Sequence, residues 1–140
     1  MSLPFGREAL AAIADEAAAL ARLAAEKPLG VVEKDDSSPV TAVDHAVDAF
    51  LRRELSRLLP GSGWLSEETL DDPTRLGRAL VWIVDPIDGT RQLVRGIPEV
   101  AISVGLVSSG RVVAAAVVNP MTGERGTWVA GTRPVFEGLR

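Results

Sequence analysis

The feature that most constrains this chain is an apolar run that stops at two carboxylates. Residues 79–84 are apolar without a break, and they are followed by Asp85-Pro86-Ile87-Asp88-Gly89-Thr90. An uninterrupted run of this length predicts a buried strand. Proline fixes its own φ and has no N–H to donate, so we expect the chain to leave the sheet at Pro86, with Asp85 and Asp88 close together.

Two carboxylates at this spacing would repel each other and raise one pKa unless a cation lay between them. A hard divalent cation such as Mg²⁺ would suit both, and the carbonyl oxygen of Ile87 would add a ligand. Gly89 and Thr90 stand where a helical turn would begin, and N–H groups at such a start favour a bound phosphate. The alternative is a sharp turn in which an Asp caps a short helix and Gly supplies an unusual φ.

The composition narrows the class of protein. A length of 140 residues predicts one domain, and a hydrophobic share of 46% is ample for a core. The net charge of -4, with no basic stripe, argues against nucleic acid as the main partner. Without cysteine and with a single histidine, any metal must be bound by oxygen. The alanine-rich residues 9–25 contain three charges, so we expect no membrane insertion and a cytoplasmic protein.

Apolar periodicity predicts two helices, at about residues 5–26 and 41–59, with a polar loop at 31–39 between them. Further along we expect a surface excursion at 71–78 and a short helix at 91–95. Strands are predicted at 64–66, 79–84, 100–106, 112–118 and 125–130. The resulting fold class is α+β, with two N-terminal helices packed on a largely antiparallel sheet.

Three acidic clusters lie at the ends of these predicted elements: Asp44, the Glu67-Glu68 pair, and Asp85 with Asp88. A single sheet layer would bring all three to one edge. Asp44 also has a structural explanation, because Thr41 and Asp44 fit the capping-box pattern of a helix start.

Four segments resemble, in order, the successive motifs of the inositol monophosphatase superfamily. They are Ser38-Pro39-Val40-Thr41-Ala42-Val43-Asp44, Leu65-Ser66-Glu67-Glu68, Trp82 to Thr90, and Asn119-Pro120-Met121-Thr122-Gly123-Glu124. The Leu-Ser-Glu-Glu form is closer to bacterial 3'(2'),5'-bisphosphate nucleotidases of the CysQ type than to inositol phosphatases with Gly-Glu-Glu. The resemblance covers residues 5–129 and implies a Mg²⁺-dependent, lithium-sensitive phosphomonoesterase with a layered sandwich fold.

The resemblance also implies a role for each matching residue. Glu67, Asp85 and the carbonyl of Ile87 would hold one metal ion, and Asp85 would bridge to a second ion that Asp88 also binds. A bound metal lowers the pKa of water from about 16 toward neutrality, and a pair about 3.5–4 Å apart compensates charge on the phosphoryl and leaving oxygens.

Asp44 and Thr90 would then orient and deprotonate the attacking water, and the amides of Gly89 and Thr90 would hold the phosphate. Proton transfer through the Thr90 hydroxyl to Asp44 is general-base catalysis, which typically contributes about 10²–10⁴ in rate. One departure concerns Gln92-Leu93, which stands where such nucleotidases have an acid and an aromatic residue.

A second departure is that no Trp-Asp-x-Ala-Ala motif, which completes the second metal site in the family, occurs in the sequence. We therefore expect residues 1–140 to be the amino-terminal metal-binding domain, with the carboxy-terminal domain absent. The expected partner is a small phosphorylated metabolite, with 3'-phosphoadenosine 5'-phosphate before inositol 1-phosphate. An inactive metal-binding interaction domain is the alternative of another class. An exposed sheet edge would favour a homodimer.

Overall fold

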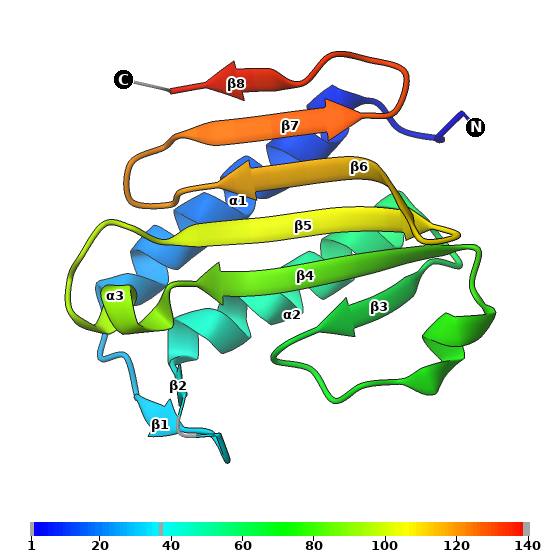
Figure 1. Ribbon diagram of the computed structural model, residues 1–140. Helices are drawn as coiled ribbons and strands as arrows, with labels where there is room; N and C mark the ends of the chain where they lie inside the picture. Colours follow the sequence, from blue (N-terminus) through cyan, green and yellow to red (C-terminus); the bar gives the residue numbers. More distant parts are fainter. Residues whose placement is uncertain (1, 37, 139–140) are drawn as a thin grey trace.

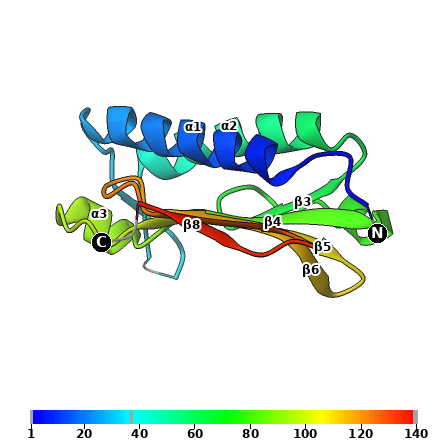
Figure 2. The same ribbon diagram turned by 90° about the horizontal axis from the view of Figure 1, so that it is seen from above.

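Two long helices, α1 (Arg7–Ala25) and α2 (Ala42–Leu58), lie side by side on one face of a six-stranded sheet (Figures 1 and 2). The structure is a computed structural model that describes residues 2–36 and 38–138. The arrangement confirms the predicted α+β class, and both helices begin and end within two residues of the predicted positions.

The face that α1 turns to the sheet consists of leucine and small alanine side chains, among them Leu10, Ala14, Ala17 and Ala21. Short side chains let the helix approach the strands closely. α2 begins after Thr41, whose hydroxyl accepts hydrogen bonds from the N–H groups of Val43 and Asp44. A polar residue that satisfies the free N–H groups of the first turn explains why this helix starts where it does.

The sheet has the strand order β3-β4-β5-β6-β7-β8. β3 (Gly63–Ser66) pairs in parallel with β4 (Leu80–Asp88), and the crossover between them contains the 3₁₀ turn η1 (Pro73–Gly77). The remaining pairs are antiparallel and join β5 (Ala101–Ser108), β6 (Arg111–Val118), β7 (Arg125–Val129) and β8 (Val135–Glu137). The parallel pair puts the carboxyl ends of β3 and β4 at the same edge (Figure 1).

The expectation that the chain leaves the sheet at Pro86 is wrong, because β4 continues to Asp88. Its pairing with β5 shifts register between Asp85 and Asp88, so the proline lies in the irregular part of the ladder. On the other side of β4, the pairing with β3 ends at Val84, so it requires no hydrogen bond from the proline nitrogen. Proline is tolerated at such an irregularity since no regular ladder bond is required from its nitrogen.

The loop predicted at residues 31–39 contains a short hairpin of β1 (Val32–Glu33) and β2 (Pro39–Val40). Ser37, which belongs to that loop, lies outside the described residues. The predicted short helix is α3 (Thr90–Val94), and it follows β4 directly. β8 was not predicted from the sequence.

The hydrophobic core lies between the helices and the sheet, with Trp82, Leu51 and Leu106 fully buried. No helix formed by the described residues covers the opposite face of the sheet (Figure 2). Ile83, Val117 and Phe136 are exposed there, and an open depression of about 760 Å³ crosses part of this face. Within the described part of the chain, no helix combines the length and apolar character needed to cross a membrane.

Candidate active site

Asp44 and Thr90, which lie far apart in the sequence, are in direct contact. Asp44 is fully buried in the first turn of α2, and its Oδ1 accepts a hydrogen bond of 2.8 Å from the Thr90 hydroxyl at the start of α3. The same hydroxyl lies 3.2 Å from the carbonyl oxygen of Ile87. The structure therefore places a hydroxyl with a carboxylate acceptor at the carboxyl end of β4.

The other oxygen of Asp44 serves the helix start. Oδ2 accepts from the backbone N–H of Thr41 at 3.0 Å and from its hydroxyl at 2.6 Å, which completes the predicted capping box. Both explanations of Asp44 left open by the sequence are thus compatible, because each uses a different oxygen of one carboxylate.

Glu67, Asp85 and Asp88 come to the same edge because Glu67 follows β3, and the two aspartates belong to the carboxyl-terminal part of β4, which is parallel to β3. Glu67 and Asp88 are exposed, whereas Asp85 is half-buried. An open pocket of about 650 Å³ is lined by these three carboxylates together with Ile87, Gly89 and Thr90. All the residues predicted for the metal and phosphate sites therefore line one pocket, which Asp44 supports from behind through Thr90.

Among these three carboxylates, Asp85 has a raised pKa. Burial, followed by the negative charges of Glu67 and Asp88, raises the pKa of Asp85 to about 6 although a hydrogen bond from the Ile87 amide opposes the shift. Its Oδ1 is buried and has no hydrogen-bond partner among residues 2–36 and 38–138. A buried carboxylate oxygen without a donor is costly, and a bound cation would satisfy it.

Within residues 2–36 and 38–138, no three Asp, Glu or His side chains are placed so that they could hold a metal ion together. The acids nevertheless suit a hard cation. The unsatisfied Oδ1 of Asp85 lies near the negative charges of Glu67 and Asp88, and the groups that could coordinate a metal there are oxygens, which hard cations prefer. Glu67, Asp85, Asp88 and the Ile87 carbonyl are the residues that could hold Mg²⁺.

Gly89 shapes the turn between β4 and α3. Its φ of 99° lies in the left-handed region, and a Cβ there would lie 2.8 Å from the carbonyl oxygen of Glu99. Only glycine fits this position without displacing the backbone. The turn delivers Thr90 to Asp44 as the first residue of α3.

Lys34 is a site residue that sequence reasoning missed. It extends from the segment after β1 into the pocket and forms a 3.1 Å ion pair with Glu68, whose side chain is 6% exposed. Burial acts to lower the pKa of Lys34, but the hydrogen bond to Glu68 and the charges of Glu68, Glu67 and Asp36 outweigh it and raise the pKa. Both adjacent acids line the pocket, but they differ in exposure: Glu68 is paired with Lys34 and nearly buried, whereas Glu67 is exposed.

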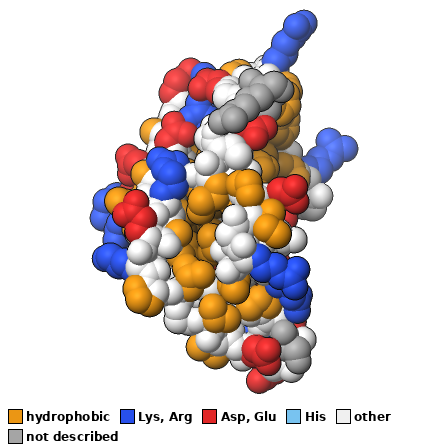
Figure 3. All heavy atoms as spheres, turned by 90° about the vertical axis from the view of Figure 1, so that its left-hand side faces the viewer, with side chains coloured by type: hydrophobic (Ala, Val, Ile, Leu, Met, Phe, Trp, Pro, Cys, Tyr) orange, Lys and Arg blue, Asp and Glu red, His pale blue; other side chains and the backbone are white. Residues whose placement is uncertain are grey.

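The pocket lies next to an apolar surface. In the space-filling view of the left-hand side of Figure 1, hydrophobic side chains gather in the middle of the face and charged side chains surround them (Figure 3). The exposed apolar residues near α3 include Val94 and Ile97.

Known proteins resemble this chain over most of its length. The model of the Inositol monophosphatase family matches residues 6–140. The histidinol-phosphatase of Mycobacterium tuberculosis is 40% identical over 129 residues, which are 91% of this chain and 48% of that protein. The 3'(2'),5'-bisphosphate nucleotidase CysQ of Escherichia coli is 36% identical over 98 residues, which are 68% of this chain and 39% of that protein.

Solved structures show the same fold. The extragenic suppressor protein suhB of Bartonella henselae superposes with a TM-score of 0.85 at 29% identity, over 95% of this chain and 52% of that chain. The chain thus spans about half the length of the proteins that it matches.

Proposed function

Because the chain belongs to the inositol monophosphatase family, we propose that its pocket serves the Mg²⁺-dependent hydrolysis of a small phosphomonoester. The observation that carries the proposal is the hydrogen bond from Thr90, in the wall of the pocket, to the buried Asp44 behind it. In the same pocket, Oδ1 of Asp85 is buried and has no hydrogen-bond partner among the described residues. A proton acceptor and the carboxylates proposed to bind the cation thus lie at one edge of the sheet.

In this proposal, Glu67, Asp85, Asp88 and the Ile87 carbonyl are the groups that would hold Mg²⁺. Bound Mg²⁺ supplies a water of lowered pKa and compensates charge on the phosphoryl oxygens. The negative charges that raise the pKa of Asp85 in the metal-free protein are those that would attract the ions.

The chain's own residues handle the proton. The Thr90 hydroxyl accepts a proton from the attacking water as it passes its own proton to Oδ1 of Asp44, at the observed 2.8 Å contact. The Thr41 N–H and hydroxyl keep the Asp44 carboxylate fixed during this transfer. The amides of Gly89 and Thr90, at the start of α3, would orient the phosphate.

We also propose that residues 1–140 act as the amino-terminal metal-binding domain of a longer fold. The chain covers about half the length of its matches, so substrate selection would come from the other half. Among substrates, the Leu-Ser-Glu-Glu motif favours 3'-phosphoadenosine 5'-phosphate, in keeping with the similarity to the Escherichia coli nucleotidase. Histidinol phosphate is a second candidate, because similarity to a histidinol-phosphatase extends over 91% of the chain.

The experiment combines Mg²⁺ titration by calorimetry with assays of phosphate release from 3'-phosphoadenosine 5'-phosphate, histidinol phosphate and inositol 1-phosphate. Mg²⁺ binding and release from one substrate are expected, and both should vanish with excess EDTA. Binding without release would mean either an inactive metal-binding interaction domain or a chain that needs the other half of the fold for turnover. A chain that binds no Mg²⁺ would contradict the proposal.

A further inference from the structure

Asp48 is a second buried acid on α2, one turn after Asp44, and no role has yet been given to it. It is 7% exposed. Its Oδ1 accepts a hydrogen bond from the Ser66 hydroxyl, and its Oδ2 accepts one from the Thr69 hydroxyl. Both carboxylate oxygens therefore bind the chain at the end of β3 and just after it.

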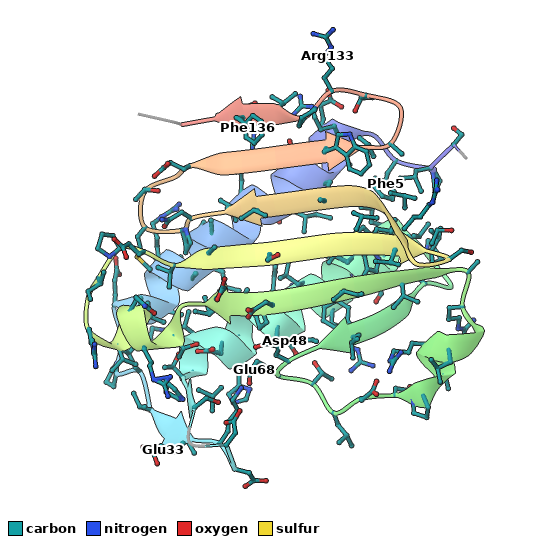
Figure 4. All side chains as sticks on the ribbon, viewed as in Figure 1. Phe5, Glu33, Asp48, Glu68, Arg133 and Phe136 are labelled. Carbon is teal, nitrogen blue, oxygen red and sulfur yellow. The ribbon has the colours of Figure 1, made fainter. Side chains whose placement is uncertain are left out.

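The two hydroxyls stand on either side of the acidic pair Glu67-Glu68. Ser66 Oγ, besides donating to Asp48, accepts from the backbone N–H of Glu68 at 3.2 Å. Thr69 Oγ1 likewise accepts from Trp64 Nε1 at 3.2 Å. Figure 4 shows Asp48 and Glu68 near one another beneath the sheet edge. Residues 66–69 are thus fastened to α2 at both ends, with the acids held between the attachments.

The negative charge of Asp48 determines which groups donate and which accept in this set of hydrogen bonds. An ionised carboxylate only accepts, so both hydroxyls must donate to it and each keeps its lone pairs for the N–H groups of Glu68 and Trp64. An amide at position 48 would turn one of its two contacts from acceptor to donor. Hydrogen bonds to an ionised acceptor are also stronger than neutral ones.

We propose that Asp48 is a positioning residue for the metal site, which holds Glu67 at the pocket by fixing residues 66–69 on α2. This inference rests on the proposed function. Asp44 and Asp48 lie one helical turn apart, so one face of α2 would locate both sides of the site: Thr90 after β4 through Asp44, and Glu67 after β3 through Asp48. Groups that orient metal ligands typically change metal affinity by about 10–100-fold when mutated.

The test compares Asp48→Asn with Val47→Ala, a change at the neighbouring, fully buried position of the same helix. Mg²⁺ affinity is measured by calorimetry, amide hydrogen exchange at Glu68 by NMR, and stability by thermal unfolding. Asp48→Asn is expected to bind Mg²⁺ about 10–100-fold more weakly and to speed exchange at Glu68. Val47→Ala should lose stability and keep wild-type Mg²⁺ affinity.

Ser66→Ala gives a second route if Asp48→Asn does not fold, since it removes the hydroxyl that joins Asp48 to the Glu68 amide. Wild-type Mg²⁺ affinity in folded Asp48→Asn or Ser66→Ala would overturn the inference, even if Glu68 exchanged faster. An equal loss of affinity in Val47→Ala would also overturn it. A wild-type chain that binds Mg²⁺ but releases no phosphate would count against the proposed function alone.

Discussion

The Thr90 hydroxyl donates its hydrogen bond to a carboxylate that stands 46 positions earlier in the chain, Oδ1 of Asp44, at 2.8 Å. This contact joins the start of α3 to the start of α2. Its geometry suits a proton relay and also satisfies a buried charge, so a substitution must be judged by both stability and turnover.

We predict that Thr90→Ala lowers turnover by about 10²–10⁴ where the protein is active, because the relay to Asp44 is lost. Mg²⁺ affinity should stay near wild type, and stability should fall by about 1–3 kcal/mol because a buried carboxylate loses a donor. Thr90→Ser, which keeps the hydroxyl, is the control. Wild-type turnover in Thr90→Ala would contradict the proposed proton relay from Thr90 to Asp44.

Asp44→Asn distinguishes the role of this residue in capping α2 from its proposed role as a proton acceptor. The amide oxygen can still accept from Thr41, so the helix start should persist, whereas an amide cannot take up the proton from Thr90. Turnover should fall far more than in Thr41→Ala, which loses the capping hydroxyl and about 0.5–2 kcal/mol of stability. Equal losses of turnover at equal stability would assign Asp44 to the cap alone. Chemical denaturation and phosphate release provide the two measurements.

For Asp85→Asn we predict opposite effects with and without metal. The pKa of about 6 in the folded protein lies above the ordinary 3.8, so between about pH 4 and 6 the folded state binds more protons than the unfolded state, and stability falls as pH rises. In EDTA the variant should therefore melt higher than wild type at pH 8, and at the same temperature at pH 4. Saturating Mg²⁺ should reverse the order at pH 8, because the variant loses a ligand. A variant that melts lower than wild type in EDTA at pH 8 would refute this account.

Gly89→Ala should be more costly than an alanine at another glycine of positive φ. Gly131 has φ 84° and nothing within 4 Å of an added Cβ, so Gly131→Ala should cost only the left-handed penalty of about 1–2 kcal/mol. Gly89→Ala adds a contact of 2.8 Å with the Glu99 carbonyl and should cost more. Urea denaturation of both variants tests this, and equal costs would show that the turn relaxes freely.

The uncovered face of the sheet leads to a prediction about self-association. Ile83 and Val117 are 44% and 46% exposed on it, although a solvated face of an antiparallel sheet normally carries polar side chains. The chain should elute later from a size-exclusion column as it is diluted, and Val117→Lys should weaken the association. Leu70→Lys, at a 94% exposed position outside the sheet, is the control. Monomeric elution at every concentration would contradict the expected homodimer.

The helices and the central strands could be predicted because apolar periodicity and capping residues are local signals. β8 could not, since its three residues depend on pairing with β7 and on an ion pair between Arg125 and Glu137. The end of β4 was misjudged because the rule for proline assumes a regular ladder, and the register shift removes that condition.

The sequence order of the acids indicated a shared edge, and the parallel pairing of β3 with β4 provides it. Lys34 was missed since its segment looks like any polar loop until the Glu68 contact is seen. Asp48 did have a signal: it follows Val47 and precedes Leu51 on the buried side of α2, where an acid needs a partner.

The two oxygens of Asp44 have different partners, so this residue can be retained for two separate reasons. One fixes the start of α2 and the other faces Thr90, so a descendant that had lost all catalysis would still be penalised for replacing this residue. Asp88 is exposed at the end of β4, and no side chain among the described residues caps the helix α3 that follows it. Under the proposed function, replacement of Asp88 in a related sequence would therefore be the earlier sign of lost activity, and an intact Asp44 would be weak evidence that the protein is still an enzyme.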